Sequence, residues 1–569
     1  MAARSSVLNK SARTSANQAE TGARRERDLG PLAQQKYDLI IIGGGITGAT
    51  ILWDATLRGM KALLLEKNDY ASGTTQATSK LIHGGLRYLR TYEFGLVRES
   101  LRERRTLARI APHGVRPEGF IMPFHKNVGH SRAKMSLALW LYDALSFDRN
   151  KGVRTDAQLP GHYYLNRSAT LAEEPVLNPK GLTGAYVYYD YANLNPERLC
   201  CEFIFSARSR GANARNYVEV NQVNRTDEGY EVHGQDALSG QTAKFSARAV
   251  VNAAGPWADF LETQTLGGGQ NRLTRSKGIH IITRKIARDK ALALTLPGPK
   301  KQHFFVLPWR NKSIIGTTDT EFQNHPDQLD VKREEIEGLI DNVNSVTRAN
   351  LRNDDVEYYY AGLRPLVESE SKQSGDDTYN ASRKIEIKHH EDAGHPGFFT
   401  ILGGKYTTSR HLAEQLVDRL ADFLPGSFNA CRTETEPLAG GDFISQSTLE
   451  REVMAEFPDT PFPKIQTLIG RYGEKAREIL ALPGAANSGE RWKAGTDEEF
   501  FAEEIEYLAS NDEIQNLSDL YFRRAGLGTA GMPSETMNRQ IAERVGRELG
   551  WTRSDVAREI KNLEERYKF

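Results

Sequence analysis

Short apolar runs separated by glycines open the ordered part of the sequence. Residues 38–42, which are apolar from Leu39 onward, and residues 62–65 are segments of the kind found in buried parallel strands. Residues 49–58 between them predict a helix that ends at Gly59. A strand, a helix and a second strand within about thirty residues form a β-α-β unit. Ordered structure is therefore predicted to begin at Tyr37.

The pattern of the remaining chain changes once, near Pro437. Before this residue, alternating or apolar segments predict strands at 213–223, 230–233, 247–253, 279–283, 303–307, 313–317, 385–388 and 398–402, followed by a helix at 407–420. After it, helical periodicity interrupted by Gly, Pro and Asn predicts helices at 446–457, 462–481, 498–510, 513–525 and 535–566. We therefore expect a mixed α/β region over residues 36–436 and a helical domain over residues 437–569.

The first 35 residues differ from both regions. They are rich in Ser, Ala, Arg and Gln and have no hydrophobic periodicity. An organellar targeting segment can have this composition, but Glu20, Glu26 and Asp28 interrupt the pattern. We favour a disordered tail over residues 1–35. A secretory signal is not predicted, because the segment contains no apolar core.

Composition narrows the class of protein. The 569 residues are 39% hydrophobic and 26% charged, which is typical of a globular chain. The 75 basic and 74 acidic residues nearly cancel, so no nucleic-acid partner is expected. Three cysteines without a Cys-x-x-Cys spacing predict no disulfide framework, no iron–sulfur ligand set and no metal site. No apolar run approaches the roughly 18–20 residues that span a bilayer. Transmembrane, collagen-like and small secreted proteins are excluded.

A glycine-rich motif follows the first predicted strand directly. Residues 43–48, GGGITG, match the Gly-x-Gly-x-x-Gly pattern of dinucleotide-binding turns. Gly43 permits the tight turn, Gly45 lets a pyrophosphate approach the backbone, and Gly48 lets the helix pack against the strand. Glu66, at the end of the second predicted strand, can accept hydrogen bonds from ribose hydroxyls. The motif alone does not separate NAD from FAD, but its place at the start of a long fold suggests FAD.

A longer signature lies just beyond this unit. Residues 72–89, SGTTQATSKLIHGGLRYL, closely resemble the signature of FAD-dependent, aerobic, quinone-linked glycerol-3-phosphate dehydrogenases. Further segments that resemble this family follow in order: VNAAGPW at 251–257, KGIH at 277–280, PW at 308–309, IGTTD at 315–319, GLRPL at 362–366, GGKYTT at 403–408, PLAGGD at 437–442 and DLYFRR at 519–524. The resemblance covers about residues 37–569. It implies an α/β fold, namely an FAD-binding domain of the glutathione-reductase type, an antiparallel-sheet substrate cap interleaved with it, and a helical C-terminal domain.

The resemblance also implies a reaction, the oxidation of sn-glycerol 3-phosphate to dihydroxyacetone phosphate by hydride transfer from C2 to FAD N5, with reduced FAD reoxidised by a membrane quinone. His280 is the candidate base, since a neutral imidazole accepts a proton near pH 7. Arg364 can bind a phosphate or an alkoxide in a planar, bidentate way. Lys405 completes the catalytic set as a cation near substrate and flavin.

Further positions are assigned to substrate and cofactor. The resemblance implies that Arg87 contacts the substrate phosphate and that Tyr88 lines the pocket, and Thr408 is a weaker substrate candidate. The residues expected to bind FAD are Gly43, Gly45, Ile46, Gly48, Glu66, Thr74, Thr75, Ser79, Leu81, Ala254, Gly255, Gly403 and Gly404. Ile279 stands where the family commonly has a small polar residue, so we expect a slightly altered pocket wall.

The quinone that the resemblance implies is dissolved in the membrane, so the enzyme is expected to reach a membrane surface. Residues 135–147 form an apolar, aromatic segment with basic flanks, which suits an in-plane helix at a membrane surface, although a buried domain helix fits the pattern equally well. The family implies a cytoplasmic enzyme attached to the inner face of the cytoplasmic membrane; a homodimer is left open. The alternatives are a glycerol-3-phosphate oxidase that reduces oxygen, another FAD-dependent amine or hydroxy-acid oxidase, and a non-enzymatic flavin sensor.

Overall fold

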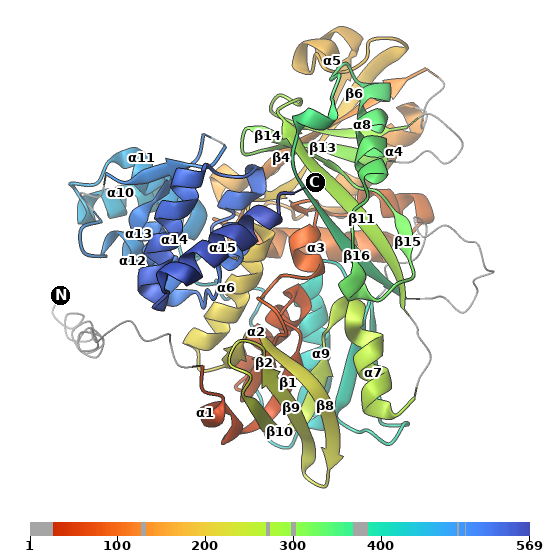
Figure 1. Cartoon of the computed structure of the whole chain (residues 1–569). Coiled ribbons are helices and arrows are strands. Elements are labelled where there is room, and N and C mark those ends of the chain that lie inside the picture. Colours follow the sequence, from red (N-terminus) through yellow and green to blue (C-terminus); the bar gives the residue numbers. More distant parts are fainter. Residues whose placement is uncertain are drawn as a thin grey trace, which may run out of the picture.

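The computed structural model describes residues 27–126, 132–268, 273–296, 303–367, 385–485, 489–495 and 497–568. An α/β body, a cap built on a second sheet and a helical C-terminal domain make up the fold (Figure 1). The predicted fold class is thus confirmed.

The predicted β-α-β unit forms the centre of the first sheet. Strand β1 (Lys36–Ile42) lies parallel between β2 (Ala62–Leu65) and β10 (Thr242–Asn252), and helix α2 (Ile46–Leu57) connects β1 to β2. The sheet extends in parallel through β7 (Asn213–Arg215) on one side and β18 (Phe398–Leu402) on the other. The short strand β17 (Glu386–His389) closes the β18 edge in antiparallel orientation. Burial on both faces explains why β1 and β2 are continuously apolar.

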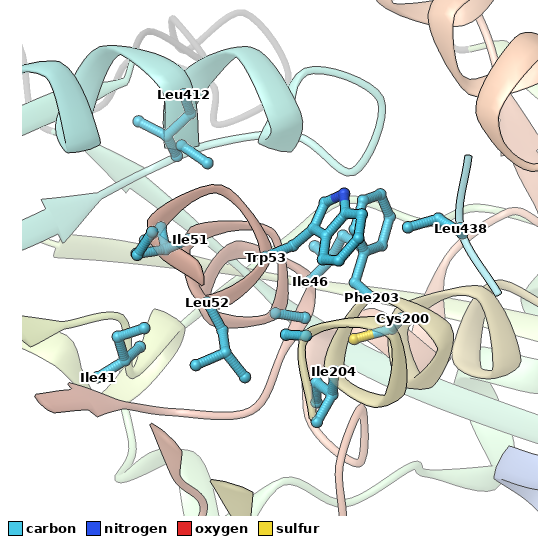
Figure 2. Close-up of a cluster of buried hydrophobic side chains, with 14 of the residues drawn as sticks. Ile41, Ile46, Ile51, Leu52, Trp53, Cys200, Phe203, Ile204, Leu412 and Leu438 are labelled. Carbon is cyan, nitrogen blue, oxygen red and sulfur yellow. The ribbon is translucent and has the colours of Figure 1, made fainter. Parts of the chain in front are cut away.

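Both faces of this sheet are covered. Helix α2 packs between α6 (Pro196–Ser209) and α9 (Ser409–Phe423), and Figure 2 shows their side chains, including Leu52, Ile204 and Leu412, gathered into one core. The opposite face carries β8 (Val218–Thr226), β9 (Gly229–Asp236) and α7 (Ala258–Leu266). The predicted strand at 213–223 is two strands, β7 and β8, because Tyr217 between them adopts a left-handed conformation (φ 57°).

The second sheet forms the cap. In the described part of the chain it has ten strands, in the order β15-β11-β14-β13-β12-β4-β6-β3, with β16 also paired to β11 and β5 to β6. Their bounds are β3 Leu81–Ile82, β4 Val115–His125, β5 Tyr163–Asn166, β6 Leu182–Asn193, β11 Leu273–Arg284, β12 Ala291–Thr295, β13 His303–Trp309, β14 Lys312–Gly316, β15 Thr320–Phe322 and β16 Val356–Val367. Among the described residues, the strand pairs of this sheet are antiparallel, except that β4 and β12 pair in parallel. Four helices accompany the sheet: α3 (Phe94–Ile110), α4 (Arg132–Leu145), α5 (Arg167–Glu173) and α8 (Arg333–Val346).

The C-terminal domain is helical and lies beside the α/β body and the cap (Figure 1). Its helices are α10 (Gln446–Glu456), α11 (Phe462–Tyr472), α12 (Ala476–Leu480), α13 (Ala502–Asn511), α14 (Glu535–Leu549) and α15 (Arg553–Glu565), with a hairpin of β19 (Arg491–Lys493) and β20 (Glu499–Phe501) and a π-helical turn at Asp519–Arg524. The single helix predicted at 535–566 is two, because Gly550 ends α14 in a left-handed conformation (φ 67°). We propose the domain division at 436/437 that the sequence predicts.

The last part of the segment that the sequence predicts to be disordered, residues 27–35, is ordered. Residues 1–26 lie outside the described residues, but residues 27–35 are placed, with a short helix α1 at Gly30–Ala33. Leu29 and Leu32 are buried against the β8–β9 face, and Arg27 forms an ion pair with Asp236 at 2.8 Å. Apolar contacts and this ion pair order the segment, which the composition of the tail concealed.

Candidate active site

The glycine-rich turn leaves no room for side chains. Gly43 has a φ of 112°, and a Cβ built on it would lie 2.6 Å from the Ala253 carbonyl oxygen. A Cβ on Gly48 would lie 1.9 Å from the Gly43 carbonyl oxygen. Strand β1, its turn and helix α2 therefore pack at backbone distance. Gly45 immediately precedes α2, so the first-turn amides of this helix face the space that a pyrophosphate would occupy.

Two polar side chains are fixed at this turn. Glu66 accepts hydrogen bonds from the amides of Gly44 (2.6 Å) and Asn68 (2.8 Å), which holds its carboxylate at the end of β2. The pKa of Glu66 is raised above its usual value, because the effect of burial outweighs the opposing effect of these two amide hydrogen bonds. Thr75 Oγ1 accepts a hydrogen bond from the Ile46 amide at 3.0 Å. This close backbone packing, helix terminus and carboxylate fit a dinucleotide with a free ribose 2′-hydroxyl.

The remaining predicted cofactor positions lie along the borders of the two sheets. Ala254 and Gly255 follow β10, the neighbour of β1, and Gly255 has a φ of 57°. Thr74 donates a hydrogen bond to the Leu363 carbonyl at 2.6 Å, which ties the loop after β2 to strand β16. Thr74, Ser79, Leu81 and Gly404 line the same cavity as the catalytic candidates, as shown below. Gly403 lies in the turn that ends β18.

Lys405 and Arg87 contact the same aromatic ring. The turn after β18 passes through Gly403 (φ 77°) and Gly404 (φ 112°) to Lys405. The Lys405 Nζ atom lies 3.8 Å from the centroid of the Tyr88 ring, and the Arg87 guanidinium carbon lies 4.9 Å from it. Tyr88 is buried. Two cations from distant segments thus meet at one tyrosine, an arrangement that favours a nearby anion.

His280 is buried on strand β11 with only 2% of its surface exposed. Its Nε2 atom lies 2.9 Å from Ser79 Oγ, and its ring stacks on Tyr360 with the centroids 4.9 Å apart. Burial, together with the positive charges of Arg364 and Lys80, holds the pKa of His280 well below its usual 6.5. The imidazole is therefore neutral at pH 7 and has the protonation state that a general base needs.

Arg364 reaches across the neighbouring strand. It lies on β16 opposite Ser276, and its guanidinium donates to Ser276 Oγ (3.2 Å), Thr317 Oγ1 (2.7 Å) and the Thr318 carbonyl (3.2 Å). A Cβ built on Gly278 would lie 2.1 Å from Arg364 Nη2. The side chain therefore crosses the β11 backbone at the one residue without a side chain. Asp319 lies 4.0 Å from the guanidinium and balances part of its charge.

One cavity joins these groups. It encloses about 1450 Å³ and is lined by His280, Arg364, Lys405, Arg87 and Tyr88, among others. This volume exceeds that of an ordinary small-ligand site, which is about 300–1,000 Å³. Thr408 is fully buried at the start of α9 and does not line the cavity, although its neighbour Thr407 does. The structure thus brings together five of the six predicted catalytic and substrate residues.

Comparison with known proteins identifies the family. The model of the FAD dependent oxidoreductase family matches residues 38–410, and that of the C-terminal domain of alpha-glycerophosphate oxidase matches residues 431–556. A glycerol-3-phosphate dehydrogenase of Synechocystis is 36% identical over 479 residues, which cover 82% of this chain and 84% of that protein. The chain belongs to the FAD-dependent glycerol-3-phosphate dehydrogenase family. The glycerol-3-phosphate dehydrogenase 2 of Mycobacterium tuberculosis is 32% identical over 93% of this chain and 88% of its own length.

A solved member of this family carries the cofactor. The crystal structure of the glycerol-3-phosphate dehydrogenase from Bacillus halodurans, complexed with FAD, superposes with a TM-score of 0.73 and 26% identity over 95% of this chain and 96% of that chain. The cofactor of the present family member is FAD, and the enzyme is an FAD-dependent oxidoreductase. The glycine turn, Glu66 and the first turn of α2 fit the adenosine diphosphate part of this group.

Sequence reasoning missed the residues that support His280, the candidate base. Tyr360, which stacks on His280, was not predicted, because only the β11–β16 register places it there. Lys80 forms a buried ion pair with Glu197 and lies 5.4 Å from the Tyr360 ring centroid. Lys80 stands inside the 72–89 signature, and its position there was the one available signal.

One expectation about the pocket wall was wrong. Ile279 is fully buried in the apolar core between β11 and α8 and does not line the cavity. Successive side chains of a strand point to opposite faces of the sheet. Because His280 faces the cavity, its neighbour Ile279 faces the core behind it.

Proposed function

We propose that this enzyme oxidises sn-glycerol 3-phosphate to dihydroxyacetone phosphate. The observation that carries the proposal is the placement of a neutral, buried histidine and three cationic side chains in one cavity beside the predicted flavin site. A secondary alcohol next to a phosphate dianion needs a base for its hydroxyl proton and cations for the phosphate and the developing alkoxide. The assigned substrate is the one that the names of the related proteins give for those relatives.

The position of each residue in the cavity indicates its role in this reaction. Arg87 and Lys405, which meet at Tyr88, bind the phosphate. Arg364 is held by hydrogen bonds to Ser276 and to Thr317 and Thr318, which follow directly after β14. Its guanidinium stabilises the charge that develops on the C2 oxygen. His280 accepts the hydroxyl proton at Nε2, the nitrogen that faces Ser79 on the cavity wall. Bound FAD supplies the oxidant, since its N5 accepts the C2 hydride and its reduced form passes two electrons to a membrane quinone.

The exposed apolar face of helix α4 supports a membrane quinone as the electron acceptor. Leu137, Trp140 and Phe147, on and just beyond this helix, are 67%, 63% and 78% exposed, while Leu139 and Tyr142 on its other side are buried. The basic residues Arg132 and Lys134 begin the helix and Arg149 and Lys151 follow it. A helix with one open apolar face and basic flanks suits the surface of an anionic bilayer. None of the described helices is long and apolar enough to cross one.

The cavity extends to this helix. Its lining includes Met135, Leu137, Ala138 and Leu141 of α4 as well as His280 and Arg364. An apolar quinone can therefore approach along α4 from the lipid side, whereas a charged phosphate meets the cations Arg87, Arg364 and Lys405 on other parts of the cavity wall. These features support peripheral attachment through residues 135–147 to the inner face of the cytoplasmic membrane.

Two experiments test these proposals. We expect anaerobic turnover of glycerol 3-phosphate with a short-chain quinone, and much slower peroxide formation in air; rapid peroxide formation without quinone reduction would instead favour the oxidase alternative. The Trp140→Glu, Phe147→Glu double variant should lose binding to vesicles containing phosphatidylglycerol but keep turnover with a water-soluble electron-accepting dye. Ile444→Glu, at a residue 86% exposed and outside α4, is the matched control and should bind vesicles normally.

A further inference from the structure

We propose that residues Asp519–Arg524 of the C-terminal domain, here called the clasp, position both halves of the active site. The FAD-binding half is built on the first sheet and the catalytic half on the second. The clasp is a buried π-helical turn that contacts elements of both halves. The part of this inference that concerns catalysis rests on the proposed function, whereas the part that concerns FAD affinity does not.

The first contact holds the loop that follows Glu66. Asp69 binds Arg523 Nε at 2.5 Å and Arg524 at 3.0 and 2.8 Å, and all three side chains are buried. Asn216 Nδ2 donates a further hydrogen bond to Asp69 at 2.9 Å. The carboxylate is thus surrounded by donors from the clasp and from the first sheet.

The same loop touches the glycine turn. The amide of Ala71 donates to the Gly44 carbonyl at 3.0 Å, and a Cβ on Gly44 would lie 2.9 Å from the ring of Tyr70. Glu66, three residues before Asp69, accepts from the Gly44 amide. The two arginines therefore hold, through Asp69, the loop that shapes the adenosine end of the cofactor site.

The second contact is a series of aromatic rings that ends at His280. Phe522 stacks on Tyr358 with a centroid distance of 5.5 Å, Tyr358 lies 6.3 Å from Tyr360, and Tyr360 stacks on His280. Tyr358, Tyr360 and Arg364 stand at even spacings on β16, so they share one face of the strand. The Phe522 ring therefore supports the face of β16 that carries Arg364 and that packs, through Tyr360, against His280 of β11.

A positioning role explains why the clasp contains buried charge. A buried ion pair adds little net stability compared with a well-packed apolar contact, because desolvation offsets the attraction. It does fix geometry, since two arginines meet one carboxylate in defined directions. Neighbouring residues of one turn thus fix a cofactor loop on one side and a catalytic strand on the other.

The FAD half is tested by titrating apoprotein with FAD and following flavin fluorescence. For Asp69→Asn we expect the Kd for FAD to rise by about tenfold or more. The control is Asp512→Asn, which removes another buried pair between the body and the C-terminal domain, Arg198–Asp512, and should change the Kd by less than about twofold. If Asp69→Asn does not fold, Arg524→Lys, which keeps the charge but loses the fork, takes its place. Equal effects of the Asp69 (or Arg524) and Asp512 variants, or no effect of the former, would overturn the proposal.

The catalytic half is tested with Phe522→Leu. We expect kcat with glycerol 3-phosphate to fall about tenfold or more, because small displacements of catalytic groups are costly, with the Kd for FAD unchanged. Phe522→Tyr keeps the ring and should restore kcat. Phe500→Leu alters another fully buried phenylalanine, which lies in the core of the C-terminal domain outside the clasp, and should lower the Tm but not kcat. Equal kcat for the Phe522 and Phe500 leucine variants would contradict the proposal. If the wild type does not oxidise glycerol 3-phosphate, the proposed function fails and the FAD titration alone decides the clasp.

Discussion

The imidazole of His280 and the phenol of Tyr360 are stacked, with their planes 17° apart. The two residues face each other across the β11–β16 pair, and the Tyr360 hydroxyl donates to the Thr78 carbonyl at 3.0 Å. The tyrosine thus fixes the plane of the histidine and ties it to the 72–89 signature segment.

Removing this stack should impair catalysis more than stability. We expect Tyr360→Leu to lower kcat for glycerol 3-phosphate by about tenfold or more, since the base loses its orientation. Tyr360→Phe keeps the ring and loses one hydrogen bond, worth about 1 kcal/mol, so its kcat should stay within about threefold of wild type. Steady-state kinetics of the two variants checks this, and equal rates for them would show that the ring does not orient His280.

The path of Arg364 over Gly278 gives a second prediction. Gly278→Ala places a methyl group where the guanidinium lies, so we expect kcat/KM to fall by about 100-fold, comparable to Arg364→Ala, with FAD still bound. The control is Gly338→Ala on helix α8, where a Cβ would meet nothing within 4 Å. Its activity should be unchanged. A fully active Gly278→Ala enzyme would mean that Arg364 can act from another position.

The acid side of the pH profile should depend on Lys80. Burial, then Arg364 and Lys80, lower the pKa of His280, so wild-type kcat/KM should hold its plateau below pH 6.5 and fall only where the histidine becomes protonated. Replacing the buried pair by Lys80→Met and Glu197→Gln removes one of these positive charges. The pKa of His280 should then rise and the acid limb move to higher pH.

A matched pair of substitutions controls for the loss of a buried ion pair. Lys464 and Glu503 form such a pair in the C-terminal domain. The Lys464→Met, Glu503→Gln variant should leave the acid limb where it is in the wild type. If both double variants shifted the acid limb equally, the limb would not report the protonation of His280.

A buried carboxylate in the cap predicts a pH-dependent stability. Glu118 on β4 accepts a hydrogen bond from the Ala291 amide, and burial raises its pKa to about 7. Because the folded state favours the protonated form, the contribution of Glu118 to stability is full below the unfolded pKa of about 4.5 and is lost as pH rises through about 7. Glu118→Gln keeps an acceptor for the Ala291 amide. It should stabilise the fold at pH 8 by up to about 3 kcal/mol and much less at pH 5. Thermal unfolding at both pH values checks this, and an equal change in Tm at both would be contrary to expectation.

The sequence predicted the parts of the fold that depend on residues close together in the chain. The β-α-β unit, the glycine turn and Glu66 are encoded within about thirty residues by apolar runs and glycines, and the structure places them as expected. Breaks that depend on one left-handed residue, Tyr217 or Gly550, were not visible in the periodicity.

The sequence predicted the charged and titratable residues of the candidate site but not the residues that hold them in place. His280, Arg364 and Lys405 lie in segments that resemble a known family, and they share one cavity. Tyr360 and the clasp contacts depend on strand register and on the packing of the C-terminal domain, which bring together residues far apart in the chain. No local spacing encodes such contacts.

The most direct test of the account is the visible absorbance of the flavin in the purified, FAD-loaded enzyme under argon. Addition of glycerol 3-phosphate should bleach the flavin, and a quinone analogue should then restore the oxidised spectrum, while Arg364→Ala with FAD retained should bleach at least about 100 times more slowly. An oxidised spectrum that persists with FAD bound and glycerol 3-phosphate in excess would contradict the proposed reaction.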